Sequence, residues 1–233
     1  YRGSTKEHSD PLMRTYLEDL IYRLSETSEV RDRRFEFIIL EDESINAFAA
    51  PGGIIGINLG MFLNTKREGE LASVMCHELA HLSQRHYARS QNRSSPLANA
   101  LMILGSIAVA AASSNPEAIM IAPAAMQQMS INYTRSNEKE ADRIGFNNLV
   151  KAGFDPNDMT MMFQRMQDKY QREDSEQFSY LMTHPLPSER LTDMRIRADN
   201  ISKPSEGSFR DNLDFYFMQK RYEIWAEKDT KEL

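Results

Sequence analysis

The stretch His77-Glu78-Leu79-Ala80-His81 decides the fold, and it lies in a run from Glu68 to Ser90 whose apolar residues recur at helical spacing. Residues four apart lie on one face of an α-helix, so the two imidazoles can bind one metal ion. Glu78 follows the first histidine and can face the open coordination position, where a carboxylate accepts a proton from water. The spacing therefore predicts a zinc site on a helix. The alternative is two surface histidines beside a solvated glutamate.

A catalytic zinc ion usually has three protein ligands, and continuing the same helix does not supply the third. Gln84 and Tyr87 stand where the longer metzincin pattern has glycine and histidine. His86 would lie on the opposite side of the helix from His77. We therefore expect His86 to be an ordinary surface or packed histidine.

The segment Asn137–Asp142, which reads Asn-Glu-Lys-Glu-Ala-Asp, opens a second helical pattern. Glu138 and Asp142 are four residues apart and share a helix face, whereas Glu140 points elsewhere. We predict that Glu138 is the third ligand and that Asp142 accepts the free N–H of His77, which would fix the tautomer of that ring. The alternative is a solvated acidic helix start, which the helix dipole also favours.

Four motifs carry a resemblance to a known family. In chain order they are Asn46–Gly53, His77–His81, Asn137–Asp142 and Thr183–Leu191. Together they resemble the gluzincin metallopeptidases of the HtpX and prenyl-protein (CAAX) protease family, and they are most similar to its soluble periplasmic BepA-like branch, from about residue 10 to residue 200.

The resemblance implies a set of site residues. It implies one zinc ion per chain, bound by His77, His81 and Glu138, with Glu78 as general base. It also implies that His184 and Arg190, in the segment that begins Thr183-His184-Pro185, reach the active site.

Two departures from the family pattern concern the extent of the chain. It lacks the membrane spans of the integral-membrane members. It also stops near residue 233, where the BepA-like proteins that it resembles continue into a tetratricopeptide-repeat domain. We expect a zinc metallopeptidase domain over residues 1–205 and a C-terminal helix over 206–233, which would be the start of a lost or truncated repeat region. Because the chain begins at Tyr1 without methionine, we also expect that a leader has been removed.

Composition agrees with one enzyme domain. A chain of 233 residues can bury a sizeable core. A net charge of -6 gives no electrostatic footprint for nucleic acid, so no nucleic-acid partner is expected. The single cysteine excludes an internal disulfide framework.

The remaining patterns predict an α+β fold that is mainly α, a zincin-like layout with a small sheet edge over the metal-binding helix. Asp10-Pro11 is a typical N-cap and first helical residue. Outside the two metal helices, we expect helices at 11–25, 156–171, 188–201 and 209–229, and strands at 35–40, 45–50 and 54–58.

We expect Asn46, Ala47, Phe48 and Ala49 to bind substrate. An edge strand with free backbone groups can hold an extended peptide by strand addition while remaining indifferent to its side chains. The alternative is an ordinary edge strand that a loop covers.

Residues 97–129 leave two interpretations open. From Ser94 to Thr134 the only charged residue is Glu117, but the apolar run from Leu97 to Ala112 is shorter than the roughly 20 residues that span a membrane. We expect two short apolar helices here. They would form either a lid beside the cleft or a membrane contact.

These expectations lead to a zinc endopeptidase that uses metal-activated water. By resemblance, it would be a soluble or membrane-peripheral periplasmic protein that acts on unfolded or misassembled envelope proteins, with the outer-membrane assembly machinery as a partner. The alternative is a chaperone or assembly factor with a latent zinc site.

The sequence leaves three roles open for His184. It could be a fourth, regulatory zinc ligand that displaces the water. It could instead stabilise the oxyanion, a role for which Arg190 is the other candidate, or be a loop histidine that caps nearby backbone.

Overall fold

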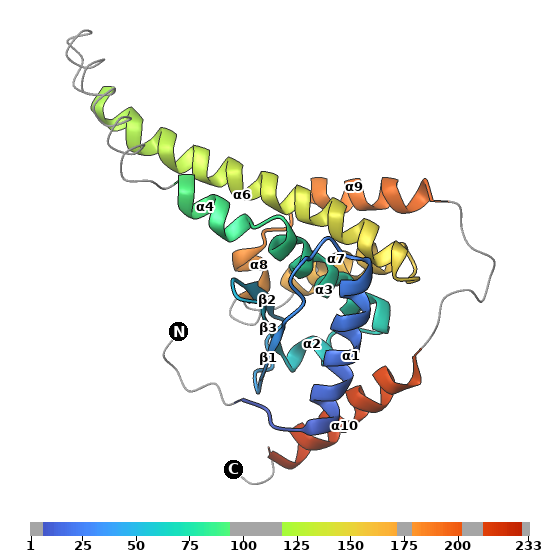
Figure 1. The fold of residues 1–233 in the computed structure, drawn as a ribbon. Helices are drawn as coiled ribbons and strands as arrows, with labels where there is room; N and C mark the ends of the chain where they lie inside the picture. The colour runs from blue at the N-terminus through green and yellow to red at the C-terminus, as the bar shows by residue number, and fades with distance from the viewer. Residues whose placement is uncertain (1–6, 94–117, 172–178, 202–211, 230–233) are drawn as a thin grey trace.

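A three-stranded sheet lies against a set of helices in the computed structural model, which describes residues 7–93, 118–171, 179–201 and 212–229 (Figure 1). The strands are β1 (Glu36–Leu40), β2 (Ala47–Ala50) and β3 (Ile54–Asn58). The helices are α1 (Pro11–Thr27), α2 (Gly60–Leu63), α3 (Glu68–Ser83), α4 (His86–Arg93), α6 (Ala118–Lys151), α7 (Asn157–Tyr170), α8 (Ser179–Thr183), α9 (Ser188–Asp199) and α10 (Leu213–Asp229). The predicted class, α+β and mainly α, is confirmed.

The sheet has the predicted hairpin at one edge. Strands β2 and β3 pair antiparallel across the turn at 51–53, where Gly52 and Gly53 have φ of 94° and 83°. Such positive angles suit glycine because it has no Cβ. Strand β1 pairs parallel with β3, so the order is β1-β3-β2. Within the described residues β2 is therefore an edge strand.

One face of the sheet forms a core with α1 and α3. Alternate residues of the strands point to this face, as the period of two requires. The side chains that meet there are buried: Leu17 and Ile21 of α1, Phe37 and Ile39 of β1, Ile55 and Ile57 of β3, and Met75 of α3. Asp10 caps α1 as predicted, because its carboxylate accepts the backbone N–H of Leu12 at 2.9 Å. This core fixes α3 against the sheet.

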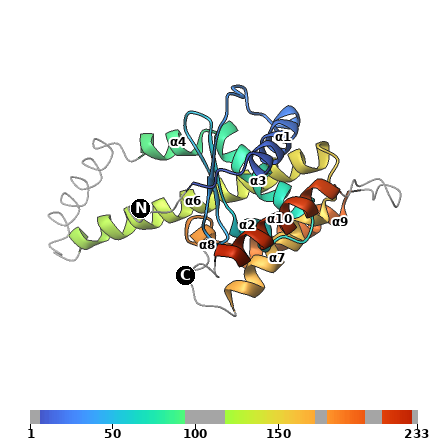
Figure 2. The same cartoon turned by 90° about the horizontal axis from the view of Figure 1, so that it is seen from below.

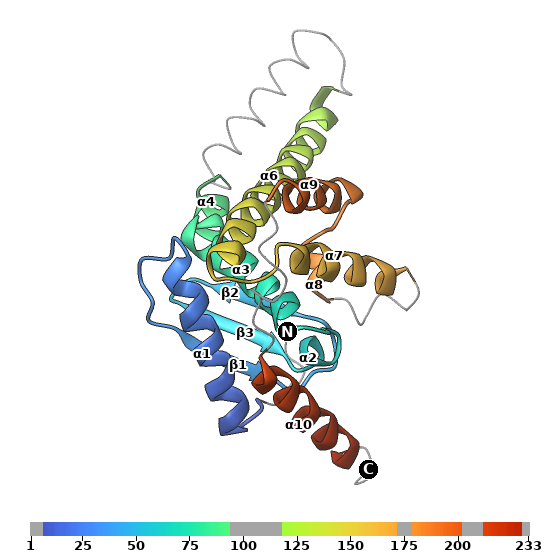
Figure 3. The same cartoon turned by 90° about the vertical axis from the view of Figure 1, so that its right-hand side faces the viewer.

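Helix α6 crosses α3, and their packing is the most extensive in the described part of the chain (Figures 1 and 3). The prediction that this helix begins at Asn137 is wrong, since α6 begins at Ala118. Neither glycine nor proline lies between Ala124 and Ile144, so nothing in the sequence stops a helix there. Glu138 therefore lies well inside a helix rather than at a helix start.

The apolar segment is described only in part. Residues 97–117 lie outside the described residues, and 118–129 belong to the amino-terminal part of α6, which extends away from the other helices and the sheet (Figure 2). The second of the two expected short helices is thus part of one long helix. Over the described residues, we find no helix with the length and apolar character needed to span a membrane.

Helix α10 packs against α1 and α2. The side-chain amide of Gln219 donates to the backbone carbonyls of Phe62 and Thr65, which ties α10 to the end of α2. The expected start at residue 209 and the proposed domain boundary at 205 both lie outside the described residues. The division into two domains remains a prediction.

Close packing of α6 on α3 depends on Gly145. A Cβ at this position would lie 3.0 Å from backbone atoms of Cys76 and His77. We expect Gly145→Ala to lower the free energy of unfolding by about 1 kcal/mol. Overpacking costs roughly 1–3 kcal/mol, and the higher helix propensity of alanine offsets about 1 kcal/mol of that cost.

Urea denaturation of the variant would measure this loss. The control is Asn147→Ala, which changes an exposed residue of the same helix and should be neutral or slightly stabilising. A Gly145→Ala protein more stable than wild type would show that the two helices do not need this close approach.

Candidate metal centre and catalytic site

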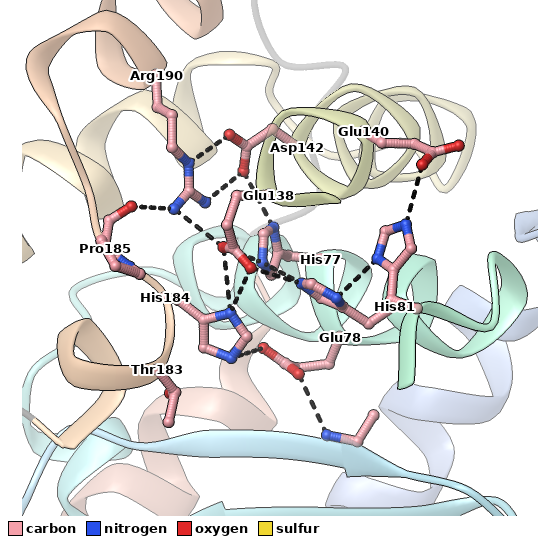
Figure 4. A network of polar contacts seen from close by, with 12 residues as sticks. His77, Glu78, His81, Glu138, Glu140, Asp142, Thr183, His184, Pro185 and Arg190 are labelled. Carbon is pink, nitrogen blue, oxygen red and sulfur yellow. Dashed lines mark hydrogen bonds and ion pairs between the residues drawn. The ribbon is translucent and has the colours of Figure 1, made fainter. Parts of the chain in front are cut away.

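Helix α3 turns His77, Glu78 and His81 toward the interior of the domain (Figure 4). The Nε2 atoms of the two histidines are 2.9 Å apart, and their ring centroids are 4.6 Å apart. His77 is fully buried and Glu78 is 1% exposed. The four-residue spacing thus brings both imidazoles to one point.

Helix α6 places two carboxylates against these rings. The Oε2 atom of Glu138 lies 3.4 Å from Nε2 of His77, and its Oε1 lies 3.4 Å from Nε2 of His81. Asp142 lies one turn further along, and its Oδ1 is 3.0 Å from Nδ1 of His77. Glu138 therefore faces the Nε2 side of both rings, and Asp142 contacts the opposite nitrogen of His77. Their roles as ligand and ligand support remain predictions.

His184 reaches the same point from the link between α8 and α9. Its Nδ1 lies 3.1 Å from Oε1 of Glu138, and its Nε2 lies 3.6 Å from Oε1 of Glu78. The ring stacks on Tyr180 at a centroid distance of 4.6 Å, and the His184 N–H donates to the Tyr180 carbonyl. These contacts hold the imidazole beside both the predicted base and the predicted third ligand.

Four side chains could hold a metal ion together. His77, His81, Glu138 and His184 each offer one ligand atom, and these atoms all lie within 4.8 Å of one another. Three imidazoles and a carboxylate form a donor set that suits zinc and similar transition metals.

Arg190 is buried among the carboxylates rather than pointing freely into the cleft. Its Nε and Nη2 each donate to Asp142 at 2.7 Å. Its Nη1 donates to the carbonyl of Pro185 at 2.6 Å and lies 3.0 Å from Oε2 of Glu138. The guanidinium therefore orients both α6 carboxylates.

The charges of the site favour a cation. Burial would raise the pKa of Glu138 and Asp142, but hydrogen bonds from the histidines and from Arg190 hold both values below their usual range. With the imidazoles neutral, as ligands must be, and Glu78 ionised, three buried carboxylates face one guanidinium, which leaves two negative charges. Buried charge that is not balanced is costly. A divalent cation would balance it, so these residues fit a metal.

A cavity of about 1360 Å³ opens beside this cluster. Its lining includes Glu78, Glu138 and His184, together with Phe48 and Ala49 of β2. The N–H of Ala49 donates to Oε2 of Glu78 at 3.2 Å, so the edge strand contacts the predicted base directly. The predicted substrate-binding strand and the histidine cluster thus border one cleft.

Comparison with known proteins identifies the family. A family model for peptidase family M48 matches residues 11–198. The chain belongs to peptidase family M48. The resemblance drawn from the four motifs and the predicted enzyme class, a metalloprotease, are thereby confirmed.

Several curated relatives match most of the chain. It is 46% identical over 195 residues to a putative beta-barrel assembly-enhancing protease of Vibrio cholerae, and the match covers 82% of this chain and 40% of the relative. It is 39% identical over 227 residues to the beta-barrel assembly-enhancing protease of Escherichia coli, with 94% and 45% covered. It is 27% identical over 197 residues to the mitochondrial metalloendopeptidase OMA1 of Schizosaccharomyces pombe, with 82% and 56% covered. The chain spans less than half the length of these bacterial relatives.

One histidine that the sequence pattern misplaced lies beside this cluster. The predicted continuous helix from Glu68 to Ser90 is wrong, because α3 ends at Ser83 and Arg85 has a φ of 54° before α4 begins. This turn brings His86 back onto the site, with its Nδ1 2.9 Å from Nδ1 of His81. Arginine rarely adopts a positive φ, so the sequence carried no turn signal.

Glu140 completes this unexpected contact. It points away from Glu138 and Asp142, as predicted, but its Oε2 lies 3.1 Å from Nε2 of His86. His86 is therefore packed rather than exposed, and it also contacts a predicted metal ligand, which was not expected.

Substitutions of the two α6 carboxylates should weaken metal binding to this M48 domain to different extents. We expect Glu138→Ala to remove the bound metal, because it deletes a predicted ligand. We expect Asp142→Asn to weaken metal binding by about 10 to 100-fold, the usual effect of losing a partner of a ligating histidine. Metal content after dialysis against a weak chelator would measure both.

Glu18→Gln is the control for these variants, since Glu18 is a surface carboxylate that pairs with Arg14 on α1. Circular dichroism would show that each variant is folded. Metal content equal to wild type in both α6 variants would remove this helix from the metal centre.

Proposed function

We propose that the chain is a zinc-dependent endopeptidase domain in which Glu78 is the general base. The observation that carries the proposal is the convergence of His77, His81 and Glu138 beside Glu78 at the wall of a large cleft. Two histidines and one glutamate form a common ligand set of catalytic zinc, which leaves a further position for water. When bound, zinc supplies Lewis acidity that polarises the scissile carbonyl and lowers the pKa of water.

Glu78 is held ready to move a proton. Its Oε2 accepts the Ala49 N–H, while Oε1 makes no hydrogen bond within the described residues. That free oxygen can accept the proton of the attacking water and deliver it to the leaving amine. The hydrogen bond from β2 fixes the carboxylate relative to a substrate that lies along the strand.

Strand addition at β2 would use alternate residues. The carbonyl of Asn46 accepts from the Asn58 N–H, so Asn46 and Phe48 direct their backbone groups toward β3. Ala47 and Ala49 direct theirs outward. Because the Ala49 N–H already donates to Glu78 and Ala47 is fully buried, a substrate in the cleft would pair with the carbonyl of Ala49.

Arg190 acts on this site through other residues. All three of its nitrogens face Asp142, Glu138 or the Pro185 carbonyl, so none is directed at a reacting carbonyl. We therefore give Arg190 a positioning role. His184, whose Nε2 faces the cleft side near Glu78, remains the residue that could stabilise an oxyanion.

The bacterial relatives are named as proteases that enhance β-barrel assembly, and this supports a setting in the bacterial envelope. We propose a periplasmic protein that hydrolyses unfolded or misassembled envelope proteins, with the outer-membrane assembly machinery as a partner. An edge strand that binds main chain rather than side chains suits substrates of varied sequence.

The central test is Glu78→Gln. We expect this variant to keep its metal and to lose proteolysis by at least about 100-fold, because the carboxylate moves a proton and is not a ligand. The measurement is cleavage of an unfolded outer-membrane protein by wild type and variant at equal zinc content, with Glu18→Gln as control.

Cleavage by Glu78→Gln at the wild-type rate would overturn this mechanism. A wild-type protein that binds zinc and prevents aggregation of the substrate, yet never cleaves it, would instead support the chaperone alternative.

His184→Ala tests whether this residue restrains the protease. We propose that His184 is an exchangeable fourth ligand, because one of its ring nitrogens lies within 4.8 Å of the candidate ligand atoms of His77, His81 and Glu138. Removing it would free the water position, so basal proteolysis should rise at equal zinc content. The matched control is His8→Ala, which removes a buried histidine that pairs with Glu41 away from the site.

The two roles of His184 predict opposite changes in the proteolysis rate of His184→Ala. If it serves the transition state alone, His184→Ala should slow turnover with zinc retained. Equal cleavage rates in wild type and variant would contradict both roles.

A further inference from the structure

His86 and Glu140 make a chain of contacts that ends on a predicted metal ligand. Nδ1 of His86 lies 2.9 Å from Nδ1 of His81, and its Nε2 lies 3.1 Å from Oε2 of Glu140. The same carboxylate oxygen accepts Nη1 of Arg89 at 2.9 Å. His86 is 4% exposed, so water does not readily substitute for these partners.

When a metal is bound, only one placement of protons gives each hydrogen bond in this series of contacts one donor and one acceptor. A neutral imidazole has one N–H donor and one acceptor nitrogen. His81 must keep the lone pair of Nε2 for the metal, so its proton lies on Nδ1 and is donated to His86. Nδ1 of His86 then accepts, and its own proton lies on Nε2 and is donated to Glu140.

The two histidines of α3 thus receive the same kind of support by different routes. His77 contacts the carboxylate of Asp142 directly through Nδ1. His81 contacts the carboxylate of Glu140 through an intervening imidazole. In metal sites a carboxylate behind a ligating histidine fixes its tautomer and ring orientation and raises its basicity.

We propose that His86 and Glu140 form a relay that positions His81 for the metal, which makes both of them positioning residues of the metallopeptidase. The proposal rests on the proposed function, because it needs a metal at His81. It also explains why α3 stops at Ser83, since a helix that continued would carry His86 away from His81.

Metal affinity is the readout that tests the relay apart from activity. Competition with a chelator would give the dissociation constants of Zn²⁺ and Co²⁺, and the visible absorption of Co²⁺ would report the geometry of the ligands. We expect His86→Leu and Glu140→Ala each to weaken binding by about 10 to 100-fold and to change the Co²⁺ spectrum.

His86→Gln should be closer to wild type than His86→Leu. The glutamine amide has an oxygen that can accept from His81 and an NH₂ that can donate to Glu140. It therefore keeps both hydrogen bonds with the same donor and acceptor order. The double variant His86→Leu/Glu140→Ala should lose no more affinity than His86→Leu alone, because Glu140 acts through His86.

The chain contains matched controls. His8 is buried and lies 3.1 Å from a glutamate, Glu41, as His86 does from Glu140. Glu18 is a surface carboxylate that pairs with an arginine, and its side chain is 33% exposed against 35% for Glu140. His8→Leu and Glu18→Ala should leave the affinity and the Co²⁺ spectrum unchanged.

Two results would overturn the relay, and they are distinguishable. If wild type binds metal and both His86→Leu and Glu140→Ala bind it equally tightly, the relay is wrong while the metal centre stands. If wild type binds neither metal, the proposed function fails and the relay fails with it. Glu140 is partly exposed, so Glu140→Ala gives an answer even if His86→Leu does not fold.

Discussion

The buried guanidinium of Arg190 ties together three of the segments around the site. It belongs to α9, it makes a two-point ion pair with Asp142 of α6, and it donates to the carbonyl that follows His184. Without Arg190, the two carboxylates that lie next to the imidazoles would repel each other and turn outward. With Arg190 behind them, Asp142 and Glu138 aim at His77 from different sides. Removing one member of a buried ion pair typically costs 3–5 kcal/mol, so stability and site geometry depend on the same contact.

Residues close in sequence could be placed from sequence alone, and residues brought together by tertiary packing could not. The spacing of His77 and His81 defines their geometry because both lie on one helix, and the same holds for Glu138 and Asp142. The start of α6 was misjudged because Asn137 and Glu138 resemble an acidic helix start, although both are buried against the site rather than solvated. Only the resemblance to a family predicted that the two helices meet at one site, because periodicity describes each helix separately.

The position of His86 and Glu140 beside the site was not predicted, and it depends on one backbone angle. Arg85 has a positive φ, and no glycine or asparagine marks that position. Without this turn, His86 would have remained a distant helix residue, and Glu140 would have had no partner at the site. The contact between His86 and Glu140 spans 54 residues, so no local pattern could reveal it. The predicted site therefore lacked the residues behind His81.

Protons and metal compete for this site. Burial alone would lower the pKa of His77, but its hydrogen bonds to Asp142 and Glu138 raise it to about 9. Without metal, His77 is therefore protonated at neutral pH, and this proton offsets part of the buried negative charge. Nδ1 keeps its proton for Asp142 in either state, whereas Nε2 must release its own before it can bind a cation. Binding of a metal at the proposed site would thus exchange one positive charge for another, so the carboxylates that favour the cation would also make its affinity depend on pH.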